Sequence, residues 1–356
     1  MKKTILITAG GTGGHIFPAL AVAKLLQANY NLVWVGAAKG IENEVVPQNK
    51  ILLETINISG LRHKGLLKLV LMPIILCRAF FQALKILLRY RPDVIVGFGG
   101  YATFPICFMG WLLRLPLLIH EQNSVPGLTN RLLARCATKI MVAFTGVLTT
   151  AKALVVGNPV RQEILELLPP EQRYANRSGG LNILVLGGSL GAKILNETLP
   201  AVFAHFPQLS IVVHQVGRGD AQMVQQQYDK VNVPAKVVNF IDDMAYAYAN
   251  ADLVICRAGA STVSEICAAG VAAIFIPYPY AVDDHQRFNV EPLVKLDAAK
   301  MLLQSQCNVL ALVELLQSLN RESCLAMAKK ANSLAIGDSS QRICELIIQS
   351  IPVYLD

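Results

Sequence analysis

The chain has 356 residues, of which 53% are hydrophobic and 16% are charged, which excludes a disordered or fibrous protein and allows two globular domains. Its net charge of +8 is unevenly spread: residues 1–160 hold 17 Lys/Arg and 5 Asp/Glu, and residues 161–356 hold 15 and 19. We therefore expect the first half to meet an anionic partner. The eight cysteines contain no CxxC pair, which is typical of a protein with reduced thiols. The apolar run near the N-terminus stops at Gly10, which argues against a signal peptide.

Residues 4–9 form a continuous apolar run, which is typical of a parallel strand covered on both faces. The loop GGTGG follows at 10–14, and a helix is expected from about residue 19. Glycines let the backbone approach a ligand, and a helix start favours an anion, so we predict a phosphate-binding loop; a plain tight turn is the alternative. Ile16 replaces the third glycine of GxGxxG and no acidic residue ends a second strand about 20 positions on, which disfavours a dehydrogenase.

Residues 55–92 contain no acidic side chain. At 100° per residue, Arg78, Lys85 and Arg89 fall within about 40° of each other on a helix, and Phe80 and Leu87 lie opposite. With the leucines of 66–71 beside it, this basic stripe is typical of docking on an anionic membrane surface; a solvated helix face is the alternative. Nucleic acid is disfavoured because no recognition motif accompanies the charge. Residues 60–65 have P-loop spacing, but Leu66 stands where lysine is needed.

Residues 94–113 carry no charge and are long enough to span a bilayer. Three glycines between 97 and 100, Pro105 and Gly110 interrupt the segment. We interpret it as a buried strand, a glycine turn and a buried helix.

The second half repeats the opening of the first. A strand at 182–186 leads into GGSLG at 187–191 and a helix at 192–199, and a strand at 251–256 echoes the one at 92–97. Two such halves predict an α/β fold with two doubly wound, Rossmann-like domains and a cleft between them. We place the first domain at 1–160 and the second at 161–339, with a hinge near 157–161; a helix in 340–356 either packs back on the first domain or simply ends the chain. Residues 169–180 are expected to form an exposed loop.

A polar run opens another expected helix at 257–265. Its N–H groups and hydroxyls suit a diphosphate, and Glu265 suits two vicinal hydroxyls of a ribose; a favourable charge near the helix start is the alternative role of Glu265. Asp283-Asp-His-Gln286 follows an expected strand at 272–276 and could contact sugar hydroxyls. The acidic pairs at 242–243 and 283–284 do not form a DxD metal motif, so we expect no metal ion.

Eight motifs, in order and spacing, resemble the MurG family of bacterial glycosyltransferases: GTGGH at 11–15, GGY at 99–101, HEQN at 120–123, GNPVR at 157–161, GGSLGA at 187–192, FIDDM at 240–244, RAGASTVSE at 257–265 and DHQ at 284–286. Members of that family move N-acetylglucosamine from UDP-GlcNAc onto lipid I, an undecaprenyl-diphosphate-linked acceptor, to make lipid II for peptidoglycan. The resemblance implies a GT-B fold, inversion at the anomeric carbon, no cofactor or metal, and a place on the cytoplasmic face of the bacterial plasma membrane.

The resemblance also implies roles for individual residues. On the acceptor side it places Thr12, Gly13, Gly14, His15, Tyr101, His120 and Glu121. To UDP-GlcNAc it assigns Asn123, Arg161, Ser189, Ile241, Ala260, Ser261, Thr262, Val263, Ser264, Glu265 and Gln286, together with Thr12, Gly13 and Gly14. Within this set, Ile241 would meet uracil, Glu265 the ribose, and Gln286 with Asn123 the sugar. Some members carry two adjacent glutamines where this chain has His285-Gln286.

An inverting transfer needs a base that takes the proton of the acceptor hydroxyl, and histidine is the usual choice near neutral pH. His15 follows the first glycine loop and is our first candidate, with His120 and Glu121 as rivals; a role in contacting the loop is the alternative for His15. Helix-start N–H groups with Arg161 and Arg257 would stabilise the leaving diphosphate.

Two other functions remain open at this point. A UDP-GlcNAc 2-epimerase can share the fold but would not need the basic first domain. A non-catalytic nucleotide-sugar-binding subunit would need only one of the two glycine loops.

Overall fold

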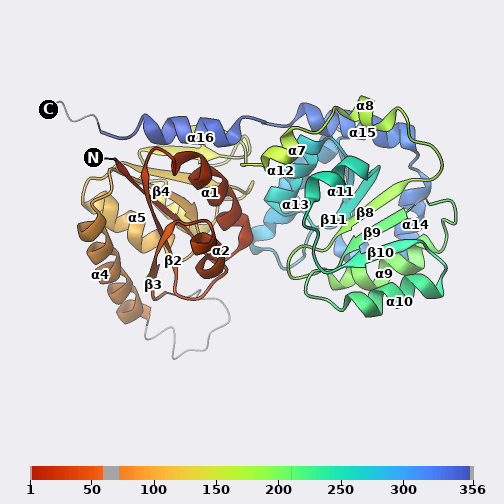
Figure 1. Ribbon diagram of the computed structural model, residues 1–356, viewed down its shortest axis with the longest axis horizontal. Coiled ribbons are helices and arrows are strands. Elements are labelled where there is room, and N and C mark those ends of the chain that lie inside the picture. Colours follow the sequence, from red (N-terminus) through yellow and green to blue (C-terminus); the bar gives the residue numbers. More distant parts are fainter. Residues whose placement is uncertain (1, 59–71, 210, 353–356) are drawn as a thin grey trace. The chain divides into compact units, whose positions relative to one another are not determined.

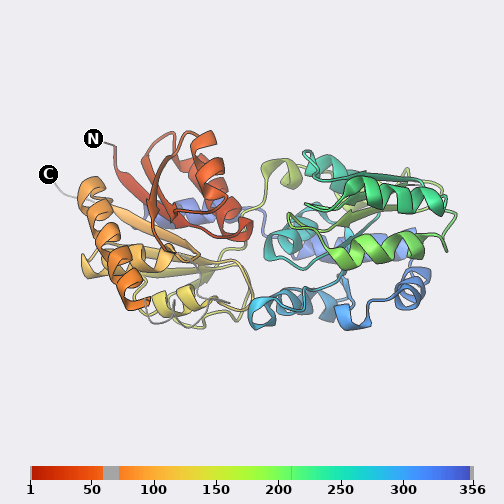
Figure 2. The same ribbon diagram turned by 90° about the horizontal axis from the view of Figure 1, so that it is seen from below.

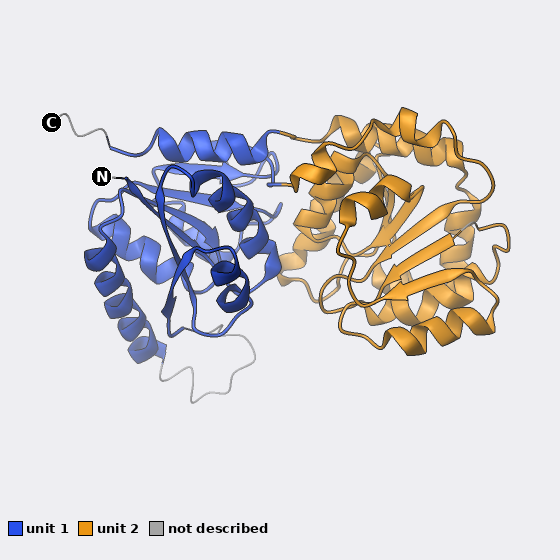
Figure 3. Cartoon of the chain, viewed as in Figure 1, with its two compact units in different colours: residues 1–159, 338–356 blue, residues 160–337 orange. Residues whose placement is uncertain are grey.

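The computed structural model describes residues 2–58, 72–209 and 211–352. Each of its two compact units contains a parallel sheet between layers of helices (Figures 1 and 2). Unit 1 consists of residues 1–159 and 338–356, and unit 2 of residues 160–337 (Figure 3). The P-loop-like spacing at 60–65 and the leucines of 66–71 lie outside the described residues.

The sheet of unit 1 is parallel throughout, with the order β3-β2-β1-β4-β5-β6-β7. Its strands are β1 (Thr4–Ala9), β2 (Asn31–Ala37), β3 (Leu52–Ile56), β4 (Val94–Gly99), β5 (Leu117–Glu121), β6 (Lys139–Val142) and β7 (Ala153–Val155). The described part of this unit contains the helices α1 (Gly13–Leu26), α2 (Glu42–Gln48), α4 (Met72–Tyr90), α5 (Thr103–Leu112), α6 (Leu128–Leu133) and α16 (Ser339–Ile348).

The apolar run of β1 supplies both faces of this sheet. Ile5 and Ile7 belong to a core cluster with α1 and α16, whereas Leu6 belongs to a second cluster with α4, α5 and α6. Successive side chains of a strand point to opposite faces, so a continuous apolar run is what a sheet covered on both sides requires. Helix α16 returns from the far end of the chain and packs against α1, with Ile343 and Ile347 fully buried (Figure 1).

The sheet of unit 2 is also parallel, with the order β10-β9-β8-β11-β12-β13. Its strands are β8 (Asn182–Leu186), β9 (Ile211–Gln215), β10 (Ala235–Val238), β11 (Leu253–Cys256), β12 (Ala272–Phe275) and β13 (Lys300–Met301). Its helices are α7 (Gln162–Leu165), α8 (Pro170–Tyr174), α9 (Lys193–Phe203), α10 (Ala221–Lys230), α11 (Met244–Asn250), α12 (Ala260–Ala269), α13 (His285–Lys295), α14 (Val309–Gln317) and α15 (Arg321–Ser333). Short 3₁₀ turns occupy Val282–Asp284 and Gln304–Gln306.

These two sheets confirm the prediction of two doubly wound, Rossmann-like domains; the expected cleft between them stays a prediction. In each sheet the strand order reverses at one place, between β1 and β4 in unit 1 and between β8 and β11 in unit 2. Ligands of open α/β sheets bind outside the carboxyl ends of the strands at such a switch point. A ligand site is therefore expected at the loops that follow β1, β4, β8 and β11.

Residues 94–113 confirm their interpretation, because they form β4, a turn with Gly99 and Gly100 at positive φ, and α5. Among the described helices, none combines the length and apolar character needed to cross a bilayer. All eight cysteines are free thiols, as expected.

Two expectations were wrong in detail. Helix α1 begins at Gly13, inside the glycine loop, six residues before the expected start. Residues 169–180 are not simply an exposed loop, because α8 lies within them and buries Pro170 and Tyr174. The reason is a tertiary contact: Arg173 donates to the carbonyls of Tyr248 and Gly270, which ties this segment to the ends of α11 and α12.

Candidate active site

The first glycine loop connects β1 to α1 at the switch point of unit 1. Gly11 has φ +89°, and Thr12 is the N-cap of α1 without a side-chain cap bond. The amides of His15 and Ile16 both donate to Thr12 O, and no acidic residue occupies the first turn. An uncapped, uncharged helix start of this kind leaves N–H groups and a positive dipole end available to an anion.

The loop after β4 lies directly against the first glycine loop. Gly10 N donates to Gly99 O at 3.2 Å, and the Thr103 hydroxyl donates to the same carbonyl at 2.8 Å. Gly100 has φ +99°, and a Cβ there would come within 2.2 Å of Gly10 O. The close approach of the two backbones therefore requires glycine at position 100. Tyr101, the residue assigned to the acceptor side, follows and is 46% exposed.

His15 lies in the first turn of α1 and is half-buried. Its Nδ1 is 2.9 Å from Gln122 Oε1, and Gln122 Nε2 is 3.1 Å from His120 Nδ1. His120 Nε2 is in turn 3.0 Å from Gly157 O. The structure thus brings together three polar side chains from α1, the end of β5 and the loop after it. A Cβ on Gly99 would lie 3.0 Å from the His15 ring, so the absence of a side chain at position 99 leaves room for this arrangement.

The two rival bases have structural partners. His120 is fully buried, and desolvation lowers its pKa to about 4, so the ring is neutral at physiological pH. Glu121 is 1% exposed, and its carboxylate accepts from the amides of Asn123 and Gly127 and from Asn130 Nδ2. These contacts hold the loop 121–127 in place. Asn123, assigned to the sugar, lies in this loop and donates to Glu121.

A buried carboxylate lies beneath the first loop. Glu42 is 0% exposed, its Oε1 accepts from Ala37 N at 3.0 Å, and its side chain packs against Gly10, Gly36 and Gly40. A Cβ on Gly10 would come within 2.7 Å of Glu42 Oε1. No sequence pattern predicts this burial, because a glutamate at the start of a helix usually faces solvent.

The second glycine loop connects β8 to α9 at the switch point of unit 2. Gly188 has φ +77° and open space where a Cβ would be, whereas a Cβ on Gly191 (φ +79°) would meet Val216 O at 2.4 Å. Ser189 is exposed at the tip of the turn, and Leu190 is 75% exposed. The loop therefore has one closely packed side and one open side that carries Ser189.

Helix α12 begins beside this loop, at the carboxyl end of β11. Its N-cap, Gly259, provides no side-chain cap bond, and Ala260 to Ser264 form the first turns. The Ser261 hydroxyl is buried and has no hydrogen-bond partner among the described residues. A buried hydroxyl without a partner is unfavourable, and a ligand oxygen at the helix start would satisfy it.

Glu265 lies on the same helix and is already paired. Its Oε1 accepts from Arg161 Nη2 at 3.1 Å and Nε at 3.2 Å, and its Oε2 accepts from the Tyr248 hydroxyl at 3.1 Å. Tyr248 is fully buried, and burial with the neighbouring Glu265 raises its pKa well above the usual value. Tyr248 therefore stays protonated, donates a hydrogen bond to Glu265 and fixes the orientation of its carboxylate. Sequence analysis had not singled out Tyr248, because its contact with Glu265 depends on how α11 packs on α12.

Two further residues line the carboxyl edge of unit 2. Gln286 is half-buried, and its Oε1 accepts from the amides of Tyr278 and Ala258, which leaves its amide nitrogen to donate elsewhere. Ile241 is half-buried after β10, next to Phe240, which is 53% exposed. His285 Nδ1 lies 2.8 Å from Val282 O, so its ring is engaged with its own turn.

Arg257 is engaged by neighbouring groups of unit 2. Its guanidinium donates to the carbonyls of Ile276 and Pro277 and to Gln304 Oε1, and it lies over the Tyr278 ring. These contacts hold the loop after β12. Of the two arginines expected near a leaving diphosphate, Arg161 is the more accessible, with a side chain that is 52% exposed.

A surface on α4 carries both charge and apolar side chains. Arg78, Lys85 and Arg89 are exposed, as are Ile74 (68%), Phe81 (69%) and Leu88 (58%). At 100° per residue these six positions fall within about 100° of one another. Phe80 and Leu87 face inward, and Phe80 packs against Phe104 and Phe108 of α5. Arg89 is paired with Glu54 at 3.3 Å, so Arg78 and Lys85 carry most of the free charge.

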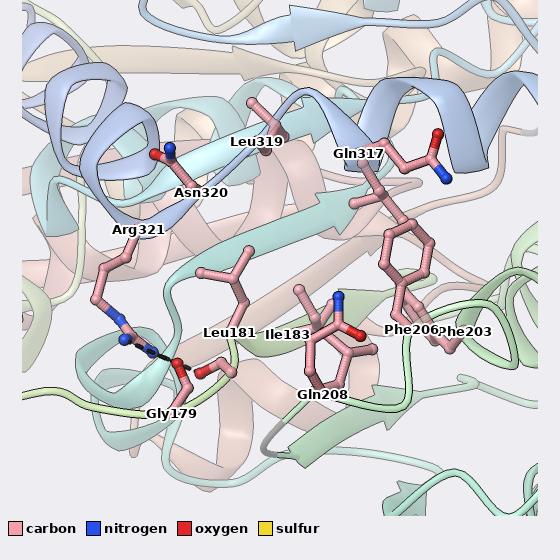
Figure 4. A pocket seen from close by; sticks show the side chains of 13 residues that line it. Gly179, Leu181, Ile183, Phe203, Phe206, Gln208, Gln317, Leu319, Asn320 and Arg321 are labelled. Atoms are coloured by element: carbon pink, nitrogen blue, oxygen red, sulfur yellow. Dashed lines mark hydrogen bonds between the residues drawn. The ribbon is translucent and has the colours of Figure 1, made fainter.

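A cavity of about 330 Å³ opens in unit 2 at the opposite edge of the sheet (Figure 4). Leu181 and Ile183, at the amino end of β8, form part of its wall, and the Arg321 guanidinium donates to Gly179 O and Gly180 O at its rim. It lies at the wrong end of β8 to belong to the glycine loop. The described residues contain no cluster of His, Cys, Asp and Glu able to hold a metal ion.

Comparisons with known proteins agree over the whole chain. Residues 5–142 match the glycosyltransferase family 28 N-terminal domain and residues 182–343 the family 28 C-terminal domain. A relative from Ralstonia nicotianae is 47% identical over 98% of this chain and 96% of its own length. A relative from Vibrio cholerae is 46% identical over 98% of each chain. Both are named UDP-N-acetylglucosamine--N-acetylmuramyl-(pentapeptide) pyrophosphoryl-undecaprenol N-acetylglucosamine transferase.

Solved structures give the same result. MurG of Acinetobacter baumannii superposes with a TM-score of 0.85 at 38% identity and covers 98% of this chain, which itself covers 99% of that protein. A UDP-GlcNAc 2-epimerase from Neisseria meningitidis superposes with a TM-score of 0.68 at 16% identity, covering 97% of this chain and 100% of that one. The second likeness concerns the fold alone.

Proposed function

The chain belongs to glycosyltransferase family 28, and from this premise we propose that it transfers N-acetylglucosamine from UDP-GlcNAc to lipid I, an undecaprenyl-diphosphate-linked N-acetylmuramyl-pentapeptide, and so makes lipid II for peptidoglycan. The observation that carries the proposal is that each unit presents a glycine loop and an uncapped helix start at its switch point. A transferase with two diphosphate-bearing substrates needs two such anion sites.

Unit 2 is proposed to hold the donor. The Ser189 loop and the start of α12 offer amides and the buried Ser261 hydroxyl to the diphosphate. Glu265 would accept from the ribose hydroxyls, and for this it must release Arg161, its present partner. The freed guanidinium then becomes available to the diphosphate, so one exchange of partners serves both ends of the nucleotide. Ile241 and Gln286 are proposed to meet the uracil and the sugar.

Unit 1 is proposed to hold the acceptor. The amides at the start of α1, with Thr12, Gly13 and Gly14, suit the acceptor diphosphate, and Tyr101 flanks them. His15 is the proposed base, because it is half-buried beside the anion site, whereas His120 and Glu121 are buried and fully engaged. As the acceptor oxygen attacks the anomeric carbon, the bond to UDP breaks and its electron pair leaves with the diphosphate. Inversion at the anomeric carbon follows from this single displacement.

The epimerase alternative is weaker, because its support is a shared fold at 16% identity. UDP release from UDP-GlcNAc should be measured with lipid I, without any acceptor, and with a chain-shortened lipid I that retains the diphosphate. We expect UDP in proportion to acceptor, and a disaccharide-linked lipid product. Release without acceptor, together with a free 2-epimerised sugar, would contradict the proposal and support an epimerase. A protein that binds UDP-GlcNAc but never releases UDP would be a binding subunit.

The α4 surface is proposed to dock on the anionic cytoplasmic leaflet of the plasma membrane. Each Lys or Arg near such a surface contributes about 1 kcal/mol, and exposed aromatic and aliphatic side chains beside them can enter the interface. The double variant Arg78→Glu/Lys85→Glu and the variant Phe81→Ser should both weaken co-sedimentation with phosphatidylglycerol vesicles. The matched control Lys230→Glu/Lys236→Glu reverses two exposed charges in unit 2. Equal loss in the control would mean that net charge, and not this surface, drives binding.

A further inference from the structure

The orientation of the Gln122 side chain is determined by its surroundings. Gln122 is 1% exposed, and its Nε2 lies 2.9 Å from Phe98 O. A carbonyl oxygen only accepts hydrogen bonds, so the atom facing it must be the NH₂ group; the flipped amide would set two oxygens against each other. The amide oxygen is therefore the atom that lies 2.9 Å from His15 Nδ1.

The orientation of His120 is determined in the same way at the other end of the chain of hydrogen bonds. His120 Nε2 lies 3.0 Å from Gly157 O, so this nitrogen carries the proton. Because the ring is buried and neutral, its Nδ1 has a lone pair, and it accepts from the Gln122 NH₂ group at 3.1 Å. The carbonyl oxygens of Phe98 and Gly157 thus both fix the donor and the acceptor in each hydrogen bond that joins His15, Gln122 and His120.

We propose that Gln122 is a positioning residue that holds His15 in the Nδ1–H tautomer, so that Nε2 is the atom that accepts the proton of the acceptor hydroxyl. The Gln122 oxygen can only accept, and His15 must therefore donate from Nδ1. This inference deepens the proposed transferase function and rests on it for the role of Nε2. The tautomer itself does not depend on the reaction.

The proton balance of the transfer follows from this tautomer. His15 Nε2 takes the hydroxyl proton as the acceptor oxygen forms its bond to the anomeric carbon and UDP departs with the electron pair of the broken bond. The ring is then an imidazolium that still donates from Nδ1 to Gln122. Its Nε2 proton passes to solvent before the next turnover.

An amide suits this position better than a carboxylate would. A neutral acceptor orients the ring and leaves the imidazolium without a compensating charge, whereas a carboxylate would stabilise the imidazolium relative to the neutral ring. The other titratable or charged groups on the elements that carry or contact His15 are Lys24 on α1, Tyr101 after β4, and His120 and Glu121 at the end of β5. Glu42 lies under Gly10, one loop away.

The tautomer can be measured on the unaltered, ligand-free protein. Histidine labelled with ¹⁵N gives different nitrogen shifts for protonated and unprotonated ring atoms, and the His15 signals are those that disappear in His15→Asn. In the neutral ring we expect a protonated Nδ1 and an unprotonated Nε2. A protonated Nε2 would overturn the proposal whatever the activity of the enzyme.

Two variants test the consequence for turnover. Gln122→Met keeps the length but removes the acceptor, and we expect kcat to fall about 10- to 100-fold with an unchanged KM for UDP-GlcNAc. Gln122→Glu should move the acid limb of the kcat profile to higher pH by about one unit or more. If both variants lower kcat without altering the ¹⁵N tautomer signature or the pH profile, Gln122 is merely structural and the proposal fails.

The matched control is Tyr228→Phe, which removes a buried hydrogen bond to Nδ1 of His214, a buried histidine of unit 2, at 2.9 Å. We expect a comparable loss of thermal stability with wild-type kcat and pH profile. If lipid I is not the acceptor, turnover assays fail for every form of the protein, whereas the ¹⁵N measurement still reports the tautomer. The two failures are therefore distinguishable.

Discussion

The two glycine loops begin alike and end differently. Aligned from the last residue of their strands, Gly10 corresponds to Gly187, Gly14 to Gly191, and His15 to Ala192. In unit 1 the helix starts within the loop, at Gly13, so that His15 lies in its first turn. In unit 2 the loop completes a turn with Gly188 and Gly191 at positive φ, and the helix starts only at Lys193.

The difference shows how one fold can serve two tasks at equivalent places. An early helix start brings a side chain of the first turn next to the anion site, where Gln122 and His120 support a titratable ring. A late start leaves a turn that presents amides, Ser189 and Leu190 but no titratable side chain. We propose that the unit 1 loop both binds a diphosphate and places a proton-accepting side chain beside it, whereas the unit 2 loop only holds a diphosphate.

The largest expected effect comes from removing this difference. His15→Ala gives the first loop the residue that the second loop has, and we expect kcat to fall by about 10²- to 10⁴-fold, the range for loss of a general base. The acid limb of the pH profile should disappear with it, while the Kd for UDP-GlcNAc stays the same. Near-native turnover with an unchanged profile would remove His15 as the base.

Each unit also contains a buried neutral histidine, which predicts acid sensitivity in both. Burial lowers the pKa of His120 to about 4 and that of His214 to about 3, both below the ordinary value of 6.5. Because the unfolded chain binds these protons first, stability is fully present above about pH 6.5 and is lost as pH falls from there towards pH 4. We expect a loss of about 2 kcal/mol per unit between pH 7 and pH 5.

Urea unfolding at the two pH values measures this loss, and the chain offers a probe for one unit alone. Both tryptophans, Trp34 and Trp111, lie in unit 1, so their fluorescence follows that unit, whereas far-ultraviolet circular dichroism follows both. His214→Gln should reduce the pH dependence of the circular dichroism transition and leave the fluorescence transition unchanged. Equal changes in both signals would show that the units do not unfold separately.

A smaller effect is expected in the donor site. Glu265→Gln removes the charge that would bind the ribose hydroxyls, and we expect the KM for UDP-GlcNAc to rise about tenfold, with kcat nearly unchanged. Tyr248→Phe leaves the charge of Glu265 in place but removes the hydrogen bond that orients it. The KM of this variant for UDP-GlcNAc should therefore rise only a few-fold. Neither variant should alter the pH limb assigned to His15. A shift of that limb would mean that proton transfer is not confined to unit 1.

Alanine substitutions at two glycines of the second loop should distinguish the cost of backbone strain from the cost of a steric clash. Gly188→Ala places a Cβ in open space at positive φ and should cost about 1 kcal/mol of folding free energy. Gly191→Ala adds a clash with Val216 O at 2.4 Å and should cost more, about 2–3 kcal/mol. Chemical denaturation of the two variants gives the difference. Equal costs would show that the turn next to Val216 can shift.

We expect no effect on turnover when metal ions are removed. With a diphosphate held by amides, Ser261 and Arg161, turnover should survive treatment with EDTA. Activity restored only by Mg²⁺ after such treatment would mean that the second loop holds a metal–diphosphate complex, and the comparison between the loops would need revision.

The sequence predicted the elements whose signal is local. Continuous apolar runs predicted β1, β4, β8 and β11, and glycines after them predicted the loops at both switch points. It did not predict contacts that join distant segments. The Arg257 side chain was expected near a diphosphate but binds carbonyls after β12, and Glu42 is buried because three glycines leave space for it.

The same limit applies to the site itself. Gln122 belonged to a quoted motif but had no assigned role, because the value of its amide depends on Phe98 O and on His15, 24 and 107 residues away along the chain. Spacing in the sequence cannot show which atom of an amide faces a ring. That information exists only once β4, β5 and α1 are side by side.

Helix α16 has a consequence for how the protein is made. Unit 2 is one uninterrupted stretch, but unit 1 needs α16, which follows unit 2 in the chain, to cover α1. We therefore expect unit 1 to be completed only after the whole of unit 2 has been synthesised. Until α16 emerges, the apolar side of α1 stays uncovered, and this nascent state is the one that chaperones would most need to protect.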